Sequence, residues 1–301
     1  MAPALPTGSP PGVAARPAAD EPTVSRPLLP AQIAVLGLLV AAVYGRALWW
    51  MVVGGWQNEY YEHAAFLPVI SAILLFRKRR EFVAAPCSMD ARGLAVVIGA
   101  LALHLAAVAV DVHFPSIVSF VLLLIGLVWW LYGEARLRVV LFPVAFLFFM
   151  VPLARVLVEY VGGPSQLVAA SLSATFARLL GLPVALAGTT VRLPCYQFDV
   201  GVPCSGLKAL VTLAALAALY AYAIEGRLWQ RGLLLAAAVP IAIVANAGRV
   251  AIVLLLGQGF SPELADGFFH GASGLVVFLI AVAALIGVGW ALGCRQIRDD
   301  L

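Results

Sequence analysis

Charged residues are scarce in this sequence. Only 11% of its 301 residues are Asp, Glu, Lys or Arg, whereas 63% are hydrophobic. An ordinary soluble domain carries about 25% charged residues. A water-soluble globule of this length would lack the polar side chains needed to cover its surface, so a soluble fold is excluded. The scarcity of charge therefore indicates a membrane protein.

Cysteine and histidine are also rare, with four of each. Four cysteines are too few for a disulfide framework in a chain of this length. No CxxC pair and no close Cys/His cluster occurs, so neither a zinc site nor an iron–sulfur site has support. We therefore expect no metal or other cofactor, and we expect no nucleic-acid partner.

Long apolar runs dominate what is present. A helix needs about 20 apolar residues to cross the hydrocarbon core, and eight stretches are candidates, the second of them short. These stretches lie near 33–53, 63–76, 92–111, 115–132, 138–157, 205–224, 232–256 and 270–293. The fold class predicted is an all-α polytopic membrane protein with about eight transmembrane helices.

The chain ends lie outside these runs. Residues 1–30 are rich in Pro, Ala and Ser and are predicted to form a disordered cytoplasmic tail. Residues 31–295 are predicted to form a single transmembrane domain. Residues 296–301 are predicted to form a second cytoplasmic tail.

The cations orient the predicted spans. If the N-terminus is cytoplasmic, 13 of the 19 Lys and Arg residues lie on the inner side, among them the run Arg77–Arg80. The positive-inside rule therefore favours both termini in the cytoplasm. The outer side then carries residues 165–181, predicted as an interfacial amphipathic helix, and residues 182–203, predicted as a short extended or hairpin segment.

Three residues that begin or interrupt the last three spans are the candidate catalytic group. Cys204 opens the sixth span, where the free N–H groups and the dipole of a helix start stabilise a thiolate. Arg249 lies inside the seventh span, where a cation costs at least about 2.5–3.5 kcal/mol unless it has a function. His270 opens the eighth span and is the natural base for Cys204. The topology carries all three to the outer face.

Further residues are expected to support this group. Lys208 lies one turn beyond Cys204, Ser205 follows Cys204, and Asn246 lies three residues before Arg249 on the same helix face. In the first outer loop, Tyr61 and His63 are candidates for substrate binding. His63 is a second, less favoured base, and a role for Tyr61 as a membrane-interface anchor is the more ordinary interpretation.

At these residues the sequence resembles the exosortase/archaeosortase family of membrane cysteine enzymes. The resemblance runs from about residue 40 to 293 and is anchored by PCSGLK around Cys204, NAGRV around Arg249 and HGASGLVVF from His270. A softer match is YYEHAAFLPVISAILLFRKRR, which contains Tyr61 and His63. The family's basic residue after Ser-Gly-aliphatic is Lys208 here rather than arginine.

The resemblance implies a thiol protease or transpeptidase of the bacterial inner membrane. Its nucleophile would be Cys204, its base His270 and its stabiliser of negative charge Arg249, with the site facing the periplasm. Its partners would be membrane lipid and secreted proteins that carry a C-terminal sorting signal, made of a short Pro-containing motif, an apolar helix and a basic tail. Bacterial members of the family are usually associated with exopolysaccharide production.

Two other functions stay open. A transporter or channel would use Arg249 and Lys208 as ligands for its substrate or ion. An intramembrane serine protease is suggested by Gly271-Ala-Ser273-Gly274, but that chemistry needs a histidine on a later helix and none follows residue 270.

Overall fold

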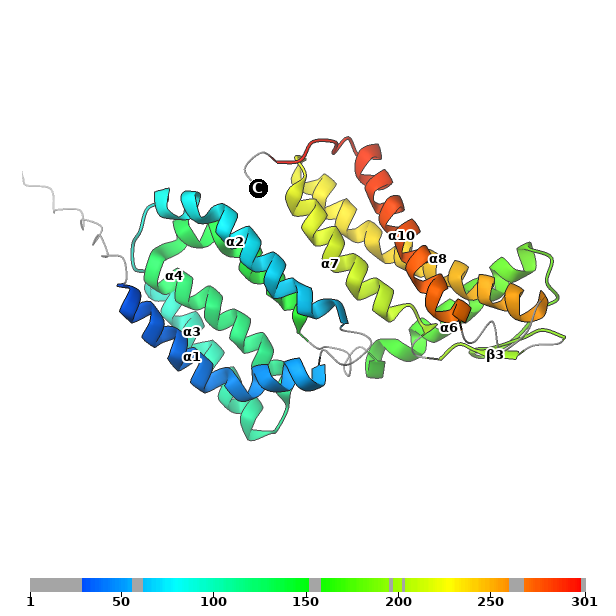
Figure 1. Ribbon diagram of the computed structural model, residues 1–301, viewed down its shortest axis with the longest axis horizontal. Coiled ribbons are helices and arrows are strands. Elements are labelled where there is room, and N and C mark those ends of the chain that lie inside the picture. Colours follow the sequence, from blue (N-terminus) through cyan, green and yellow to red (C-terminus); the bar gives the residue numbers. More distant parts are fainter. Residues whose placement is uncertain are drawn as a thin grey trace, which may run out of the picture.

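The computed structural model describes residues 29–55, 62–151, 158–194, 197–201, 204–259 and 268–298. Within these residues the chain forms two groups of helices, α1 to α4 and α6 to α10, which lie beside each other (Figure 1). Tyr61 and Cys195 lie outside the described residues, as do residues 1–28 of the predicted N-terminal tail.

The first group contains four α-helices and three short helical turns. Their bounds are α1 Pro30–Trp50, η1 Met51–Gly55, η2 Glu62–Phe66, α2 Leu67–Ala84, α3 Ala91–Ala109, α4 His113–Ala145 and η3 Phe146–Met150. Prolines lie in the first turns of α1 and α2. A backbone N–H in the first turn has no acceptor within the helix, so proline costs no hydrogen bond there.

Helix α4 is a hairpin of two helical arms that reverse at Gly133. Gly133 has φ +86° and ψ 173°, outside the helical region, and its φ is one that L side chains rarely adopt. The two arms lie side by side. Val121 of the first arm and Phe146, the first residue after the second arm, belong to one buried cluster. The predicted span 115–132 lies within the first arm. The predicted span 138–157 begins in the second arm and continues through η3, and its residues 152–157 lie outside the described residues.

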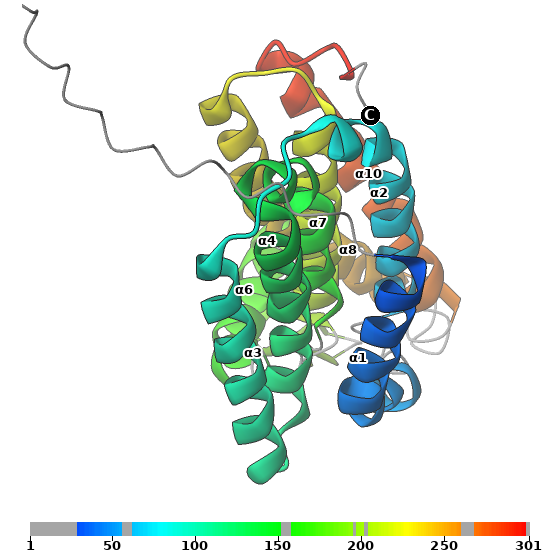
Figure 2. The same ribbon diagram turned by 90° about the vertical axis from the view of Figure 1, so that its left-hand side faces the viewer.

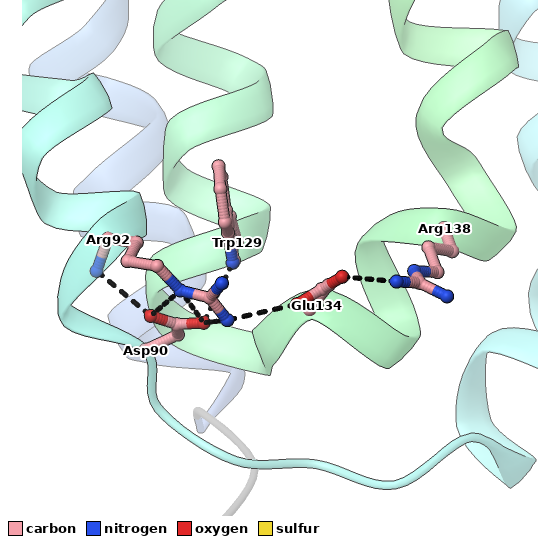
Figure 3. Close-up of polar contacts among 5 residues, drawn as sticks. All are labelled: Asp90, Arg92, Trp129, Glu134 and Arg138. Carbon is pink, nitrogen blue, oxygen red and sulfur yellow. Dashed lines mark hydrogen bonds and ion pairs between the residues drawn. The ribbon is translucent and has the colours of Figure 1, made fainter.

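Ionic contacts hold the turn of this hairpin to the start of α3 (Figure 3). Asp90 caps α3 by accepting from the backbone N–H of Arg92 at 2.9 Å, and its carboxylate pairs with the Arg92 guanidinium at 2.8 Å. The indole of Trp129 donates to the same carboxylate at 2.9 Å. Arg92 also pairs with Glu134, just beyond the turn, at 2.9 Å. Glu134 in turn pairs with Arg138 of the second arm.

The second group contains the remaining helices and a small sheet. Their bounds are η4 Val158–Gly162, α6 Gly163–Leu179, β1 Ala185–Ala187, β2 Thr190–Arg192, β3 Gln197–Asp199, α7 Leu207–Ala223, α8 Leu228–Gly259 and α10 Phe268–Ala291. The three strands pair antiparallel in the order β1-β2-β3, with Val191 opposite both Leu186 and Phe198. Helix α6 and the sheet occupy the stretches predicted as an amphipathic helix and an extended segment.

Buried apolar side chains join the two groups. One cluster contains Met51 of η1, Leu67 of α2, Phe146 of η3 and Ala215 of α7. Helix α7 thus packs against the first group as well as against α8, with which it shares a second cluster at Leu213 and Ala242.

Five helices of the described chain are long and apolar enough to cross a membrane. They comprise residues Pro30–Gly54, Ala91–Ala109, His113–Met150, Leu228–Gln258 and Gly274–Ala291, of which His113–Met150 contains both arms of the α4 hairpin together with η3. Helix α7 is a shorter apolar helix of 17 residues. The architecture is that of a polytopic helical membrane protein, whereas the predicted number of eight crossings and the outer placement of α6 and the sheet stay predictions.

Segments that are far apart in the sequence lie together at one end of the molecule (Figures 1 and 2). Both views place the C-terminal end of α2, the connection between α7 and α8 and the segment that follows α10 at one end of the molecule (Figures 1 and 2). Residues 296–298 are held there by backbone hydrogen bonds from Glu225 to Gln296 at 2.9 Å and from Arg298 to Ala223 at 2.8 Å. The start of α7 and the small sheet lie at the other end.

Candidate active site

Cys204 lies just before α7, as the sequence predicts, and is buried with 7% exposure. Its backbone N–H donates to the carbonyl of Gly201 at 3.0 Å, and its own carbonyl accepts from the side-chain amide of Asn246 on α8 at 2.8 Å. Asn246 is 4% exposed, so this is a buried hydrogen bond that fixes the Cys204 backbone against α8.

Gly206 makes this close approach of α7 and α8 feasible. It caps α7 with a left-handed φ of +84°, a conformation that favours glycine. A Cβ atom at this position would meet the side chain of Asn246 at 3.0–3.1 Å. Gly206 therefore provides both the left-handed backbone that precedes α7 and the space for the Asn246 amide, which holds the Cys204 carbonyl. Ser205 is buried with 8% exposure.

A cavity of about 760 Å³ begins beside this segment and is lined mainly by apolar side chains. Gly206 of α7, Asn246 and Arg249 of α8 and Gly274 of α10 line it near Cys204. Lys208 lines it one turn along α7. The structure thus brings Lys208, Asn246 and Arg249 to one cavity. The wall of this cavity begins at Gly206, two residues after Cys204.

Arg249 lies against the start of α10. A Cβ atom on Gly274 would stand 4.0 Å from the Cζ and Nε atoms of the guanidinium, so the absence of a side chain at residue 274 leaves room for Arg249 between α8 and α10. The guanidinium is partly buried in a mostly apolar wall. Its planar set of five N–H donors suits a carbonyl oxygen or an oxyanion in the cavity.

His63 of η2 lines the same cavity from the first helix group. Its ring nitrogen Nδ1 lies 3.2 Å from the hydroxyl of Thr212 on α7. Thr212, which also lines the cavity, is a residue that the sequence analysis missed. Its position four residues after Lys208 on one helix face is the signal that would have identified it.

The remaining predicted residues are placed only in part. His270 is the third residue of α10, at the same end of that helix as Gly274, and its side chain lies outside the described part. Tyr61 lies outside the described residues altogether. Outside the predicted set, Asp199 of β3 accepts hydrogen bonds from the hydroxyls of Thr189 and Thr190 at 2.9 and 3.2 Å and so braces the turn between β1 and β2.

Among known proteins, the family model described as transmembrane exosortase (Exosortase_EpsH) matches residues 55–287, which is most of the chain. The match includes η2, the whole of α2 to α8 and α10 as far as residue 287, and thus every residue of the cavity wall. No curated protein and no solved structure matches the chain.

Proposed function

We propose that this chain, which belongs to the transmembrane exosortase family, is a cysteine protease or transpeptidase that cleaves the C-terminal sorting signals of secreted proteins. The signal is a short Pro-containing motif followed by an apolar helix and a basic tail. The enzyme works in the bacterial inner membrane with both termini in the cytoplasm and its site on the outer side. Its activity is linked to exopolysaccharide production and to envelope biogenesis.

One observation supports this proposal above others: Cys204 is fixed at the start of α7 beside a cavity that Lys208 and Arg249 line. A nucleophile, two cationic donors and a space for a chain segment are the parts that acyl transfer requires. The buried hydrogen bond from Asn246 to the Cys204 carbonyl keeps the nucleophile in position. A transporter would not need a cysteine held in this manner.

The proposed reaction has two halves. His270 takes the proton of the Cys204 thiol. The thiolate attacks the carbonyl carbon of the scissile amide, and Arg249 donates hydrogen bonds to the oxyanion that forms. His270 protonates the amine as the C–N bond breaks, which leaves an acyl thioester on Cys204. Water or an acceptor nucleophile of the cell envelope then attacks the thioester and gives its proton to His270. The C–S bond breaks, and the thiolate of Cys204 leaves and recovers the proton from His270.

Processing of a co-expressed substrate tests the proposal. A secreted protein with a candidate sorting signal from the same genome is produced together with the enzyme, and loss of its C-terminal segment is followed by mass spectrometry. We expect Cys204→Ala and Cys204→Ser to abolish processing, because neither side chain supplies a thiolate. The matched control is Cys294→Ala, since Cys294 is also buried but lies in the cluster at the opposite end of α7.

The control is expected to retain processing, and all variants are expected to reach the membrane in equal amounts. Undiminished cleavage by Cys204→Ala would overturn the proposal. A hydroxylamine-sensitive adduct between Cys204 and the substrate would separate the enzyme from a transporter, which forms no such adduct.

A further inference from the structure

The Thr212 hydroxyl has two contacts, and together they favour one tautomer of the His63 imidazole. The Thr212 hydroxyl has a single proton and donates it to the backbone carbonyl of Lys208 at 2.9 Å. The same oxygen lies 3.2 Å from His63 Nδ1. Because the hydroxyl proton is already used, the oxygen is the acceptor in the second contact and Nδ1 carries the hydrogen. In the neutral ring, Nε2 is then the acceptor nitrogen.

The cavity runs along the helices rather than across them. Its wall extends from Gly206 to Leu213 on α7, from Arg249 back to Ala242 on α8 and from Gly274 to Ala281 on α10. Seven helical residues span about 10 Å at 1.5 Å per residue. Leu213, Ala242 and Ala281 meet in one buried cluster, so the three helices close the far end of the cavity with apolar side chains.

His63 is placed toward this far end rather than beside the nucleophile. Thr212 lies five residues into α7, about 7.5 Å along its axis, and Cys204 precedes the first residue of that helix by three positions. A base that deprotonates a thiol must lie within about 3 Å of it. The position of Thr212 therefore favours a contact of His63 with the bound chain over a contact with Cys204.

We infer that His63 is a specificity-determining residue and that Thr212 is its positioning residue. His63 Nε2 accepts a hydrogen bond from the substrate within the cavity, and Thr212 keeps the ring in the tautomer that permits this. The donor is a backbone N–H, a hydroxyl or a side-chain amide of the bound peptide. An extended chain covers about 3.3–3.6 Å per residue, so the donor lies within about four residues of the scissile bond.

This inference rests on the proposed function for the identity of the ligand, and binding to an inactive enzyme tests it apart from catalysis. In the Cys204→Ala background, the dissociation constant of a peptide with the sorting signal is measured with His63→Phe and with Thr212→Val. Each is expected to weaken binding about threefold to tenfold, the ordinary effect of one lost hydrogen bond. Thr212→Ser, which retains the hydroxyl, is expected to bind like the parent.

The matched control for Thr212→Val is Thr175→Val. Thr175 likewise donates to a backbone carbonyl four residues earlier, that of Ser171 at 2.8 Å, but it lies on the exposed face of α6. We expect no change in binding from this control. Because Thr212 acts through His63, Thr212→Val is expected to add no further loss when His63→Phe is already present.

In the active enzyme, the same variants are expected to raise KM and to leave kcat within about twofold, because the lost contact is made equally in the bound and transition states. A fall in kcat at unchanged KM would overturn the inference. Unchanged binding by both variants in an enzyme that still cleaves would overturn it too, without affecting the proposed function.

The tautomer has a readout that needs no substrate. The nitrogen NMR spectrum of ¹⁵N-histidine-labelled protein is recorded with and without His63→Phe to assign the ring. We expect a protonated Nδ1 and an unprotonated Nε2, and we expect Thr212→Val to alter this state. A proton on Nε2, or on both nitrogens, would overturn the inference even if no substrate of the enzyme were found.

Discussion

At the scale of single residues, the site depends on a glycine as much as on its reactive side chains. Gly206 has a left-handed backbone and lies against Asn246, whose amide holds the carbonyl of Cys204. A side chain at residue 206 would therefore act twice, through backbone strain and through displacement of the amide. The two effects are separable because the chain contains a glycine with the same backbone conformation and open surroundings.

Gly206→Ala is expected to destabilise the protein more than Gly181→Ala does. Both glycines have φ +84°, so both variants incur a conformational cost of about 1–2 kcal/mol. Only at residue 206 does the new methyl group meet Asn246, whereas nothing lies within 4 Å of a Cβ at residue 181. Loss of the buried hydrogen bond to Cys204 adds about 1–3 kcal/mol. Chemical unfolding in detergent micelles measures the difference.

The same pair of variants distinguishes effects on the site. Gly206→Ala is expected to change the rate at which Cys204 is alkylated by a small maleimide, and Gly181→Ala is expected to leave that rate unchanged. Equal destabilisation by the two variants would show that Asn246 is not displaced.

At the scale of elements, the hairpin α4 is fastened to α3 by charge. Asp90 is the centre of this contact, since it caps α3, pairs with Arg92 and accepts from Trp129. The hydrogen bonds from Arg92 lower the pKa of the Asp90 carboxyl from 3.8 to about 2. The carboxylate therefore binds its partners in the folded protein at pH values at which the unfolded chain is already protonated.

This depressed pKa predicts a specific loss of stability in acid. The contribution of Asp90 is complete at a pH well above its unfolded pKa of 3.8 and is lost as the pH falls from there to about 2. Asp90→Asn lacks the titrating group. Its thermal unfolding temperature is therefore expected to fall less than that of the parent between about pH 5 and about pH 2.

The control for Asp90 is Asp111→Asn. Among the described residues, Asp111 has one ionic contact, at 3.5 Å with Arg46, and both side chains are 79% exposed. Its positive φ of 52° is one that asparagine tolerates. Asp111→Asn is expected to keep the acid dependence of the parent; a parental slope in Asp90→Asn instead would refute the role of the Asp90 contacts.

At the scale of the whole molecule, the structure separates a basic end from the end that holds Cys204. The end of α2, which carries the run Arg77–Arg80, lies with the α7–α8 connection and the segment that follows α10 (Figures 1 and 2). The start of α7 and the sheet lie at the opposite end. Under the positive-inside rule, this arrangement predicts that Cys204 faces the outer side of the membrane.

Labelling with a membrane-impermeant thiol reagent tests this orientation. In a cysteine-free background, Leu179→Cys marks the end of α6 and Leu228→Cys marks the start of α8, with parental side chains that are 78% and 84% exposed. In spheroplasts, the cysteine at residue 179 is expected to react and the one at residue 228 to react only after permeabilisation. The reverse pattern would invert the proposed topology.

Much of the helical architecture was predictable from the sequence alone, because crossing a membrane requires long apolar runs and these are local features. The family was likewise predictable, since the motifs around Cys204, Arg249 and His270 are short and contiguous, and the family match from residue 55 to 287 confirms that resemblance. The reversal at Gly133 left a gap between two predicted spans, and the structure places a turn in that gap.

Only the tertiary structure decided which residues share a cavity. His63 and Thr212 are 149 positions apart, and no periodicity relates them; they meet because η2 packs beside α7. The use of Asn246 to hold Cys204 was equally hidden, since the spacing to Arg249 indicates a shared helix face but not the neighbour on α7. Apolar patterns determine that helices form, whereas the pairing of helices depends on side-chain shape and small residues at points of contact, which distant parts of the chain supply jointly.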